Sequence, residues 1–184
     1  MTLANQLTLT RLILIPVFVV VYYLPFAWSH FAAAAVFTLA GITDWLDGYV
    51  ARKYDQSTPL GAFMDPVADK LMVAVAVVML VGHHSEPLFT VASVIIIGRE
   101  IVISALREWM AELGKRASVA VSYVGKIKTT AQMLSIGLLL AFNTEWYSWL
   151  YYTGYVLFYV AAALTLWSMV IYLRAAWPDL MADE

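Results

Sequence analysis

Residues 44–70, DWLDGYVARKYDQSTPLGAFMDPVADK, decide how this chain can fold. The segment concentrates carboxylates in a chain that is 62% hydrophobic and only 13% charged; they are Asp44, Asp47, Asp55, Asp65 and Asp69. Serine, threonine, proline and glycine gather at 57–61, and clusters of these residues interrupt helices. We therefore expect two helices that meet at this interruption as antiparallel neighbours, with acidic side chains near their shared end.

The composition indicates a membrane protein with an all-α fold. Apolar runs of membrane-spanning length recur along the 184 residues, and the mean hydropathy is +0.77. We expect a single domain over 1–184 that forms a bundle of six transmembrane helices. The predicted spans are roughly 7–24, 31–54, 66–81, 87–113, 123–142 and 149–176. The absence of cysteine excludes disulfides, thiolate metal sites and cysteine nucleophiles.

The basic residues predict how the bundle is oriented. None of the 11 Lys and Arg residues lies in the loops predicted at 25–30, 82–86 and 143–148. Because Lys and Arg are enriched on the cytoplasmic side of membranes, we expect both termini to be cytoplasmic. His30, His83 and His84 lie in the loops on the opposite side, and we expect all three to be solvated.

The spacing of the acids predicts a cation site. Asp44 and Asp47 are three residues apart, and Asp65 and Asp69 are four apart, so each pair shares one face of a helix. Carboxylate oxygens without His or Cys select a hard cation such as Mg²⁺ or Mn²⁺, which offsets the repulsion among the acids. Ion pairs with nearby basic side chains are the alternative, but exposed pairs of that kind contribute little stability.

The depth and neighbours of these acids indicate the kind of ligand. Asp44 precedes Arg52 by eight residues, or roughly 12 Å along a helix, which places it below the water surface. Gly48 and Gly61 lack side chains, so a ligand or another backbone can come close. The guanidinium of Arg52 offers a fork of donors that suits phosphate. Together these features predict a site for a phosphorylated lipid.

The acidic stretch resembles the CDP-alcohol phosphotransferase family, and the likeness in length and helix number covers nearly the whole chain. The matching positions are Asp44-x-x-Asp47-Gly48-x-x-Ala51-Arg52 and Gly61-x-x-x-Asp65-x-x-x-Asp69. Members of this family move a phosphatidyl or similar group from a CDP-linked donor to an alcohol and release CMP.

The resemblance implies a role for each of these residues. It implies that the divalent cation, Mg²⁺ or Mn²⁺, is bound by Asp44, Asp47, Asp65 and Asp69, and that Asp69 is also the general base. It implies that the donor, CDP-diacylglycerol, is bound by Asp47, Gly48, Arg52 and Gly61. The family analogy also suggests a homodimer among membrane lipids, and we expect no nucleic-acid partner.

Three further stretches resemble the bacterial branch of the family whose acceptor is sn-glycerol 3-phosphate. They are NQLTLTR at 5–11, GREIVISALR at 98–107 and GKIKT at 125–129. This likeness implies a location in the bacterial cytoplasmic (inner) membrane, with the active site facing the cytoplasm. Arg107 and Lys126 are the candidates to bind the acceptor phosphate, and snorkelling to lipid headgroups is their alternative role.

Other assignments stay open at this point. Arg99 lies deep in the fourth predicted helix, so it must face a polar cavity or pair, and we do not expect the adjacent Glu100 on its face. A serine or inositol acceptor is an alternative within the family. A cation transporter with buried carboxylates is an alternative of another class, but such sites usually accompany repeats or broken helices.

Overall fold

The chain folds into helices joined by short connections. The computed structural model describes residues 3–54, 58–114, 123–145 and 147–181, with the side chains at 3–4, 45, 47–54, 59, 62, 123–126 and 179 outside the description. The helices are α1 (Leu3–Tyr22), α2 (Ser29–Tyr54), α3 (Pro59–His83), α4 (Pro87–Glu112), α5 (Tyr123–Ala141) and α6 (Ser148–Leu180). The described residues contain no strand, which confirms the predicted all-α class and the number of helices.

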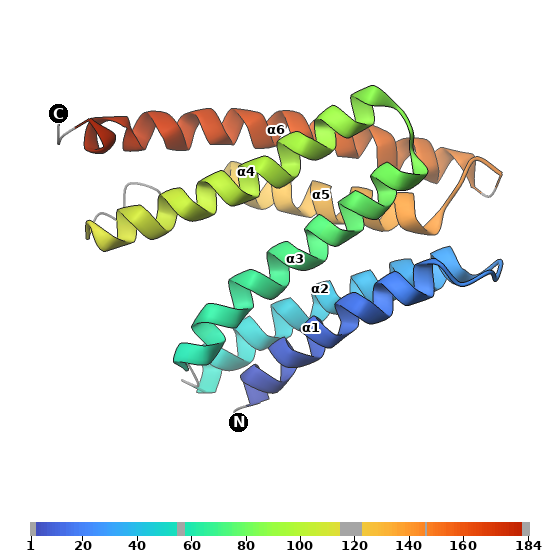
Figure 1. Cartoon of the computed structure of the whole chain (residues 1–184), viewed down its shortest axis with the longest axis horizontal. Coiled ribbons are helices and arrows are strands. Elements are labelled where there is room, and N and C mark those ends of the chain that lie inside the picture. The colour runs from blue at the N-terminus through green and yellow to red at the C-terminus, as the bar shows by residue number, and fades with distance from the viewer. Residues whose placement is uncertain (1–2, 55–57, 115–122, 146, 182–184) are drawn as a thin grey trace.

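The helices run back and forth along one direction (Figure 1). The connections after α1, α3 and α5 lie at one end of the bundle, and both chain termini lie toward the other. α1 packs on α2, α5 packs on α6, and α3 contacts both α1 and α4. The acidic segment therefore lies at the same end as the termini, as the antiparallel arrangement of α2 and α3 requires.

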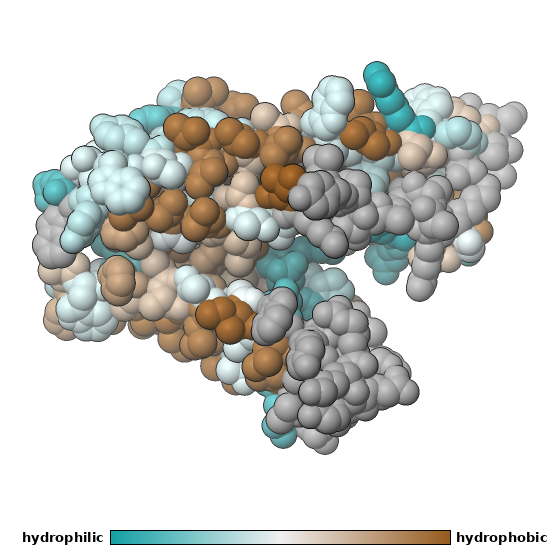
Figure 2. Space-filling model, turned by 180° about the vertical axis from the view of Figure 1, so that it is seen from behind, coloured by the Kyte–Doolittle hydropathy of each residue, from teal (hydrophilic) through white to brown (hydrophobic). Residues whose placement is uncertain are grey.

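The surface identifies the chain as a membrane protein. Three helices are long and apolar enough to cross a bilayer, over Asn5–Tyr22, Pro87–Glu112 and Ser148–Pro178. Large apolar side chains such as Val20, Val94 and Trp167 are exposed on these helices, and brown apolar patches cover much of the face in Figure 2. The predicted number of six helices is confirmed. Among the described residues three of these helices have spanning character, so six membrane spans stay a prediction.

The start of α3 corrects the sequence prediction, which began this helix at Pro66. The helix begins at Pro59, because the Thr58 hydroxyl accepts a hydrogen bond from the Gly61 amide at 3.0 Å and caps the first turn. Proline is favoured at the first helical position, where its missing N–H costs nothing. Asp65 therefore lies inside α3, not at its first turn.

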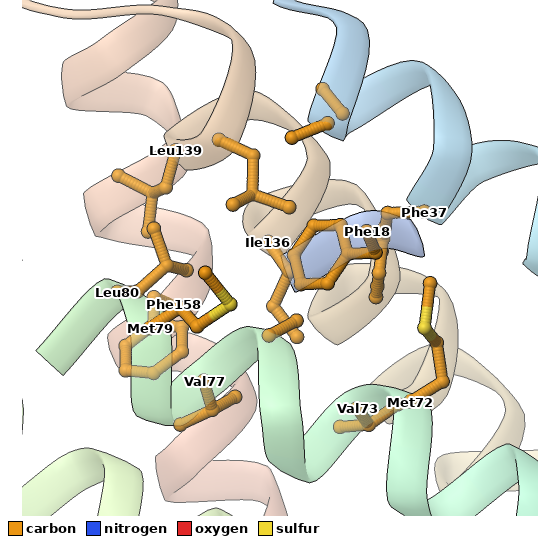
Figure 3. Packing of buried hydrophobic residues seen from close by; sticks show 14 of the residues in the cluster. Phe18, Phe37, Met72, Val73, Val77, Met79, Leu80, Ile136, Leu139 and Phe158 are labelled. Atoms are coloured by element: carbon orange, nitrogen blue, oxygen red, sulfur yellow. The ribbon is translucent and has the colours of Figure 1, made fainter. Parts of the chain in front are cut away.

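The core lies in the middle of the bundle and toward the end that carries the connections after α1, α3 and α5. Its buried side chains include Phe18 of α1, Phe37 of α2, Ile136 of α5 and Phe158 of α6 (Figure 3). α5 and α6 approach closely at Gly154, where an added Cβ would come within 3.1 Å of Leu138 and Leu139 side-chain atoms. This packing leaves the opposite end of the bundle for polar side chains.

One of the three histidines near the connections after α1 and α3 differs from the prediction. His83 is exposed and His30 is half-buried, but His84 is only 6% exposed, so the expectation of three solvated rings is wrong for His84. Its ring packs against Phe89 and Tyr155, with centroids 4.9 and 5.2 Å apart. Burial among aromatic rings and the neighbouring His83 lower the pKa of His84 to about 4.

Candidate active site

Helix α1 places a row of polar side chains against the acidic stretch. Asn5, Thr8 and Arg11 are 7%, 1% and 1% exposed, although the rest of α1 is mostly apolar. They are spaced by three residues, so they follow one inclined ridge of the helix. Buried polar groups are costly unless they have partners, and the partners of this row lie on α2 and α3.

Two of these side chains contact predicted metal ligands. The Thr8 hydroxyl donates a hydrogen bond to Oδ1 of Asp65 at 2.6 Å. Arg11 donates from Nη1 to Oδ1 of Asp44 at 2.6 Å, and this ion pair joins a side chain that is 1% exposed to one that is 45% exposed. Each acid therefore contacts α1 through its Oδ1 atom.

Asn5, the third side chain of the row, explains why residue 61 is a glycine. The Thr58 hydroxyl donates to Oδ1 of Asn5 at 2.8 Å. A Cβ added at Gly61 would lie 2.9 Å from that same Asn5 oxygen and 3.2 Å from the Thr58 hydroxyl. Glycine is thus required here by the close approach of α1 and the α3 cap, in addition to any approach of a ligand.

The remaining predicted ligands are placed only in part. Asp47, Gly48 and Arg52 lie on α2, but their side chains are outside the described residues. Asp69 is within electrostatic range of Asp44 and Arg11. Among the described side chains, no group of three or more His, Cys, Asp or Glu is close enough to hold a metal ion. The convergence of all four acids therefore stays a prediction, and the all-carboxylate donor set fits Mg²⁺ or Mn²⁺.

A polar pocket of about 450 Å³ lies next to Asp69, between α3, α4, α5 and α6. Figure 2 shows hydrophilic atoms at the base of the hollow that opens between the ends of the helices. The charged side chains that line the pocket are Asp69, Lys70, Arg99, Glu100, Arg107 and Lys128. Four are cations and two are carboxylates, so the pocket carries an excess of two positive charges.

Glu100 organises one wall of this pocket. Its Oε1 atom accepts from Nζ of Lys128 at 2.5 Å and from Nη1 of Arg99 at 3.2 Å. Arg99 also donates to the Ser168 hydroxyl of α6 at 3.3 Å. The prediction that Arg99 faces a polar cavity or pairs is confirmed. Its partner is the adjacent Glu100, which was not expected on the same face of the helix.

Arg107 lies on the same pocket with fewer partners. Its guanidinium carbon is 5.4 Å from the centre of the Tyr172 ring, and that of Arg99 is 5.6 Å from the same ring. The buried Nε of Arg107 has no hydrogen-bond partner among the described residues. Among the described residues Arg107 forms no ion pair, whereas Arg99 and Lys128 both pair with Glu100.

The sequence reasoning missed three pocket residues. Lys128 is 3% exposed and lies in the pocket, whereas the side chain of Lys126, the predicted residue, lies outside the described part of α5. Lys70 lines the pocket and hydrogen-bonds the Ser104 hydroxyl. Tyr172 comes from α6, in a region where the sequence offers only an apolar pattern. The signal that the sequence offered for Lys128 was a lysine at the start of an otherwise apolar helix.

An apolar groove adjoins the polar pocket. It lies between α2 and α5, has a volume of about 990 Å³, and is lined by side chains such as Phe37, Ile42 and Leu134. Thr129 lines both the groove and the polar pocket. The acids, the cationic pocket and the apolar groove thus lie near one another. Together they can accommodate a phosphorylated lipid and a second, anionic molecule.

Comparisons with known proteins agree with this arrangement. The sequence profile described as CDP-alcohol phosphatidyltransferase matches residues 1–167. The chain is 57% identical over 175 residues to the CDP-diacylglycerol–glycerol-3-phosphate 3-phosphatidyltransferase of Escherichia coli (strain K12), with 95% of this chain and 94% of that protein covered. Proteins of the same description from Shigella flexneri serotype 5b (strain 8401) and Shigella sonnei (strain Ss046) show the same identity and coverage.

Proposed function

Because this chain belongs to the CDP-alcohol phosphatidyltransferase family, we propose that it is an enzyme that transfers the phosphatidyl group of CDP-diacylglycerol to sn-glycerol 3-phosphate. The products are phosphatidylglycerophosphate and CMP, and the reaction is a step of phospholipid biosynthesis. The observation that carries the proposal is the 57% identity, over 95% of the chain, to relatives described by this activity.

The chemistry needs a base beside both substrates. The acceptor hydroxyl oxygen attacks the phosphorus that bears diacylglycerol, the bond from this phosphorus to the bridging oxygen of the diphosphate breaks, and CMP leaves. Asp69 accepts the hydroxyl proton. Its position supports this role, because Asp69 lines the cationic pocket and also lies within electrostatic range of Asp44.

The acids at the ends of α2 and α3 would hold the divalent cation, Mg²⁺ or Mn²⁺; they are Asp44, Asp47, Asp65 and Asp69. When bound, the cation neutralises charge on the diphosphate. Asp47, Gly48, Arg52 and Gly61 bind the nucleotide end of the donor, and we assign Arg52 to its diphosphate because a guanidinium suits phosphate. The contacts of Asp44 and Asp65 with α1 support a preformed site on these helices.

The acceptor phosphate binds in the cationic pocket, with Arg107 and Lys126 as its ligands. The excess of two positive charges among the pocket side chains matches a dianionic phosphate. Arg107 is best suited to this contact, because Glu100 already pairs with Arg99 and Lys128. A serine or inositol acceptor would bring no phosphate to these cations.

The apolar groove between α2 and α5 holds an acyl chain of the donor. Its residues extend along α5 from Thr129 to Ala141, or about 18 Å at 1.5 Å per residue, and one leaflet of the hydrocarbon core is about 15 Å deep. The groove meets the polar pocket at Thr129, so one lipid can reach the acids and the groove together.

The active site faces the cytoplasm of a bacterial inner membrane, and the enzyme acts as a homodimer. The lack of Lys and Arg in 25–30, 82–86 and 143–148 supports this orientation, and the dimer rests on analogy with the family. A cysteine introduced at Ser85 should react only with a reagent applied outside the cytoplasmic membrane. Chemical crosslinking in native membranes tests the dimer.

The test of the proposed function is acceptor-dependent release of CMP. Purified protein in detergent, with CDP-diacylglycerol and Mg²⁺ or Mn²⁺, should release CMP when sn-glycerol 3-phosphate is added. Glycerol, serine and inositol are the matched acceptors without this phosphate. Equal CMP release with glycerol would contradict the proposed phosphate-binding role of the pocket. Release only with serine or inositol would show that the acceptor is not sn-glycerol 3-phosphate.

A further inference from the structure

The polar row of α1 is not explained by membrane insertion. Arg11 is fully inside the protein and not at a lipid-facing surface, where a basic side chain could snorkel to headgroups. Thr8 is equally buried, and its hydroxyl bonds a carboxylate 57 residues away in the chain. A helix that served only as a membrane anchor would have no need of either side chain at these positions.

The two contacts reach the two acids that lie on different helices. Thr8 bonds Asp65 of α3, and Arg11 pairs with Asp44 of α2. Each contact uses Oδ1 at 2.6 Å, the length of a strong charge-assisted hydrogen bond. A single rigid helix therefore sets the orientation of one carboxylate from each side of the proposed cation site.

We propose that α1 supplies the outer layer of the cation site, in which Thr8 and Arg11 are positioning residues for Asp65 and Asp44. By fixing Oδ1 of each carboxylate, they turn Oδ2 toward the place of the divalent cation. The inference rests on the proposed function, since that proposal assigns the acids to the cation. Carboxylates that bind metals are commonly held in this way, and loss of such a partner typically lowers metal affinity 10- to 100-fold.

Asn5 makes the third contact of the row and supports the same arrangement. It bonds the Thr58 cap and occupies the space that a side chain at residue 61 would need. The start of α3 is thus fixed to α1 one turn before Asp65. The charge of Arg11 also reduces the mutual repulsion of Asp44 and Asp69, which lie within electrostatic range of each other.

The experiment measures Mn²⁺ binding to the purified protein without substrates, by electron paramagnetic resonance and by the Mn²⁺-dependent rise in Tm. Thr8→Val keeps the shape of the side chain and removes the hydroxyl, so the Mn²⁺ concentration for half-saturation should rise 10- to 100-fold. Thr8→Ser restores the hydroxyl and should bind Mn²⁺ within about threefold of the unmutated protein. Thr10→Val is the matched control, because Thr10 is an exposed residue of α1 whose hydroxyl donates to the backbone oxygen of Gln6.

A packing role for α1 gives a different result. The Tm of Thr8→Val would then fall in excess chelator while half-saturation by Mn²⁺ stayed unchanged, and that outcome overturns the proposal. If Thr8→Val does not fold, the same Mn²⁺ titration is made with Arg11→Lys. This variant keeps the positive charge but loses the guanidinium, so the Mn²⁺ concentration for half-saturation should again rise. Absence of Mn²⁺ binding to the unmutated protein also overturns the proposal, whereas the acceptor-dependent release of CMP tests the function separately.

Discussion

The guanidinium of Arg107 lies over the ring of Tyr172, with its central carbon 5.4 Å from the ring centre. An aromatic side chain of α6 thus lies beside a cation of α4 in the lining of the polar pocket. Because the face of an aromatic ring attracts a cation without neutralising it, Arg107 keeps its charge available for an anion.

Arg107→Ala should therefore weaken use of the acceptor and not of the donor. Charge-assisted hydrogen bonds to phosphate contribute about 1.5–3 kcal/mol, so the KM for sn-glycerol 3-phosphate should rise by about one to two decades. The KM for CDP-diacylglycerol should stay nearly unchanged. Steady-state kinetics with each substrate varied in turn measure the effect, and Lys126→Ala should behave in the same way. An equal rise in both KM values would show that these residues bind the donor or maintain the fold.

Asp69→Asn should remove the base and keep the fold. The amide has nearly the same shape as the carboxylate but cannot accept the hydroxyl proton, so kcat should fall by about 10²- to 10⁴-fold. Thermal unfolding in detergent and binding of CDP-diacylglycerol provide the controls, and both should stay close to those of the unmutated protein. Turnover near the unmutated level would assign the base to another residue.

Gly137→Leu should narrow the groove between α2 and α5. A Cβ at Gly137 would meet no atom within 4 Å, so the new side chain can enter the groove without a clash. Displacing one or two methylene groups of an acyl chain costs about 0.8 kcal/mol each, which raises the KM for CDP-diacylglycerol about 4- to 15-fold.

The control for the groove is Gly82→Leu, at another position where an added Cβ meets nothing and which does not line the groove. This variant should leave the KM for CDP-diacylglycerol unchanged. If Gly137→Leu also had no effect on donor kinetics, the acyl chain would have to lie elsewhere.

His84 should make the protein sensitive to acid. Burial and His83 lower its pKa from 6.5 to about 4, so the unfolded chain binds the proton more readily than the folded protein. The neutral ring therefore contributes its full stability above pH 6.5 and loses it as the pH falls toward 4. The Tm of His84→Gln should change less between pH 7 and about pH 4 than that of the unmutated protein. His83→Gln, at an exposed position, serves as the control; equal pH dependence in both variants would exclude His84 as the cause.

The sequence allowed the helix number and the acidic stretch to be predicted, because apolar length and residue spacing are local properties. The predicted start of α3 at Pro66 is too late, because the Thr58 cap and Pro59 begin the helix earlier. The contacts of Thr8 and Arg11 join residues 57 and 33 positions apart. Helical periodicity carries no information on such pairs, because they depend on how α1 packs on α2 and α3.

The residues of the polar pocket could likewise be predicted from the sequence only in part. Arg99 and Arg107 were identifiable as basic residues in an apolar helix, but Tyr172 and Ser168 join them only because α6 packs on α4. The orientation of Lys128 toward the pocket depends on the rotation of α5 about its axis, which the short motif alone does not determine. Lys128 enters the pocket wall through its pair with Glu100.

The most direct measurement is the transfer of radiolabel from sn-glycerol 3-phosphate into lipid by the purified protein. With CDP-diacylglycerol and Mg²⁺ or Mn²⁺ present, labelled phosphatidylglycerophosphate should form with one CMP released for each molecule of product. Excess chelator should abolish the transfer, because the acids of α2 and α3 would lose their cation. Release of CMP without labelled lipid, or transfer that persists without a divalent cation, would contradict the account.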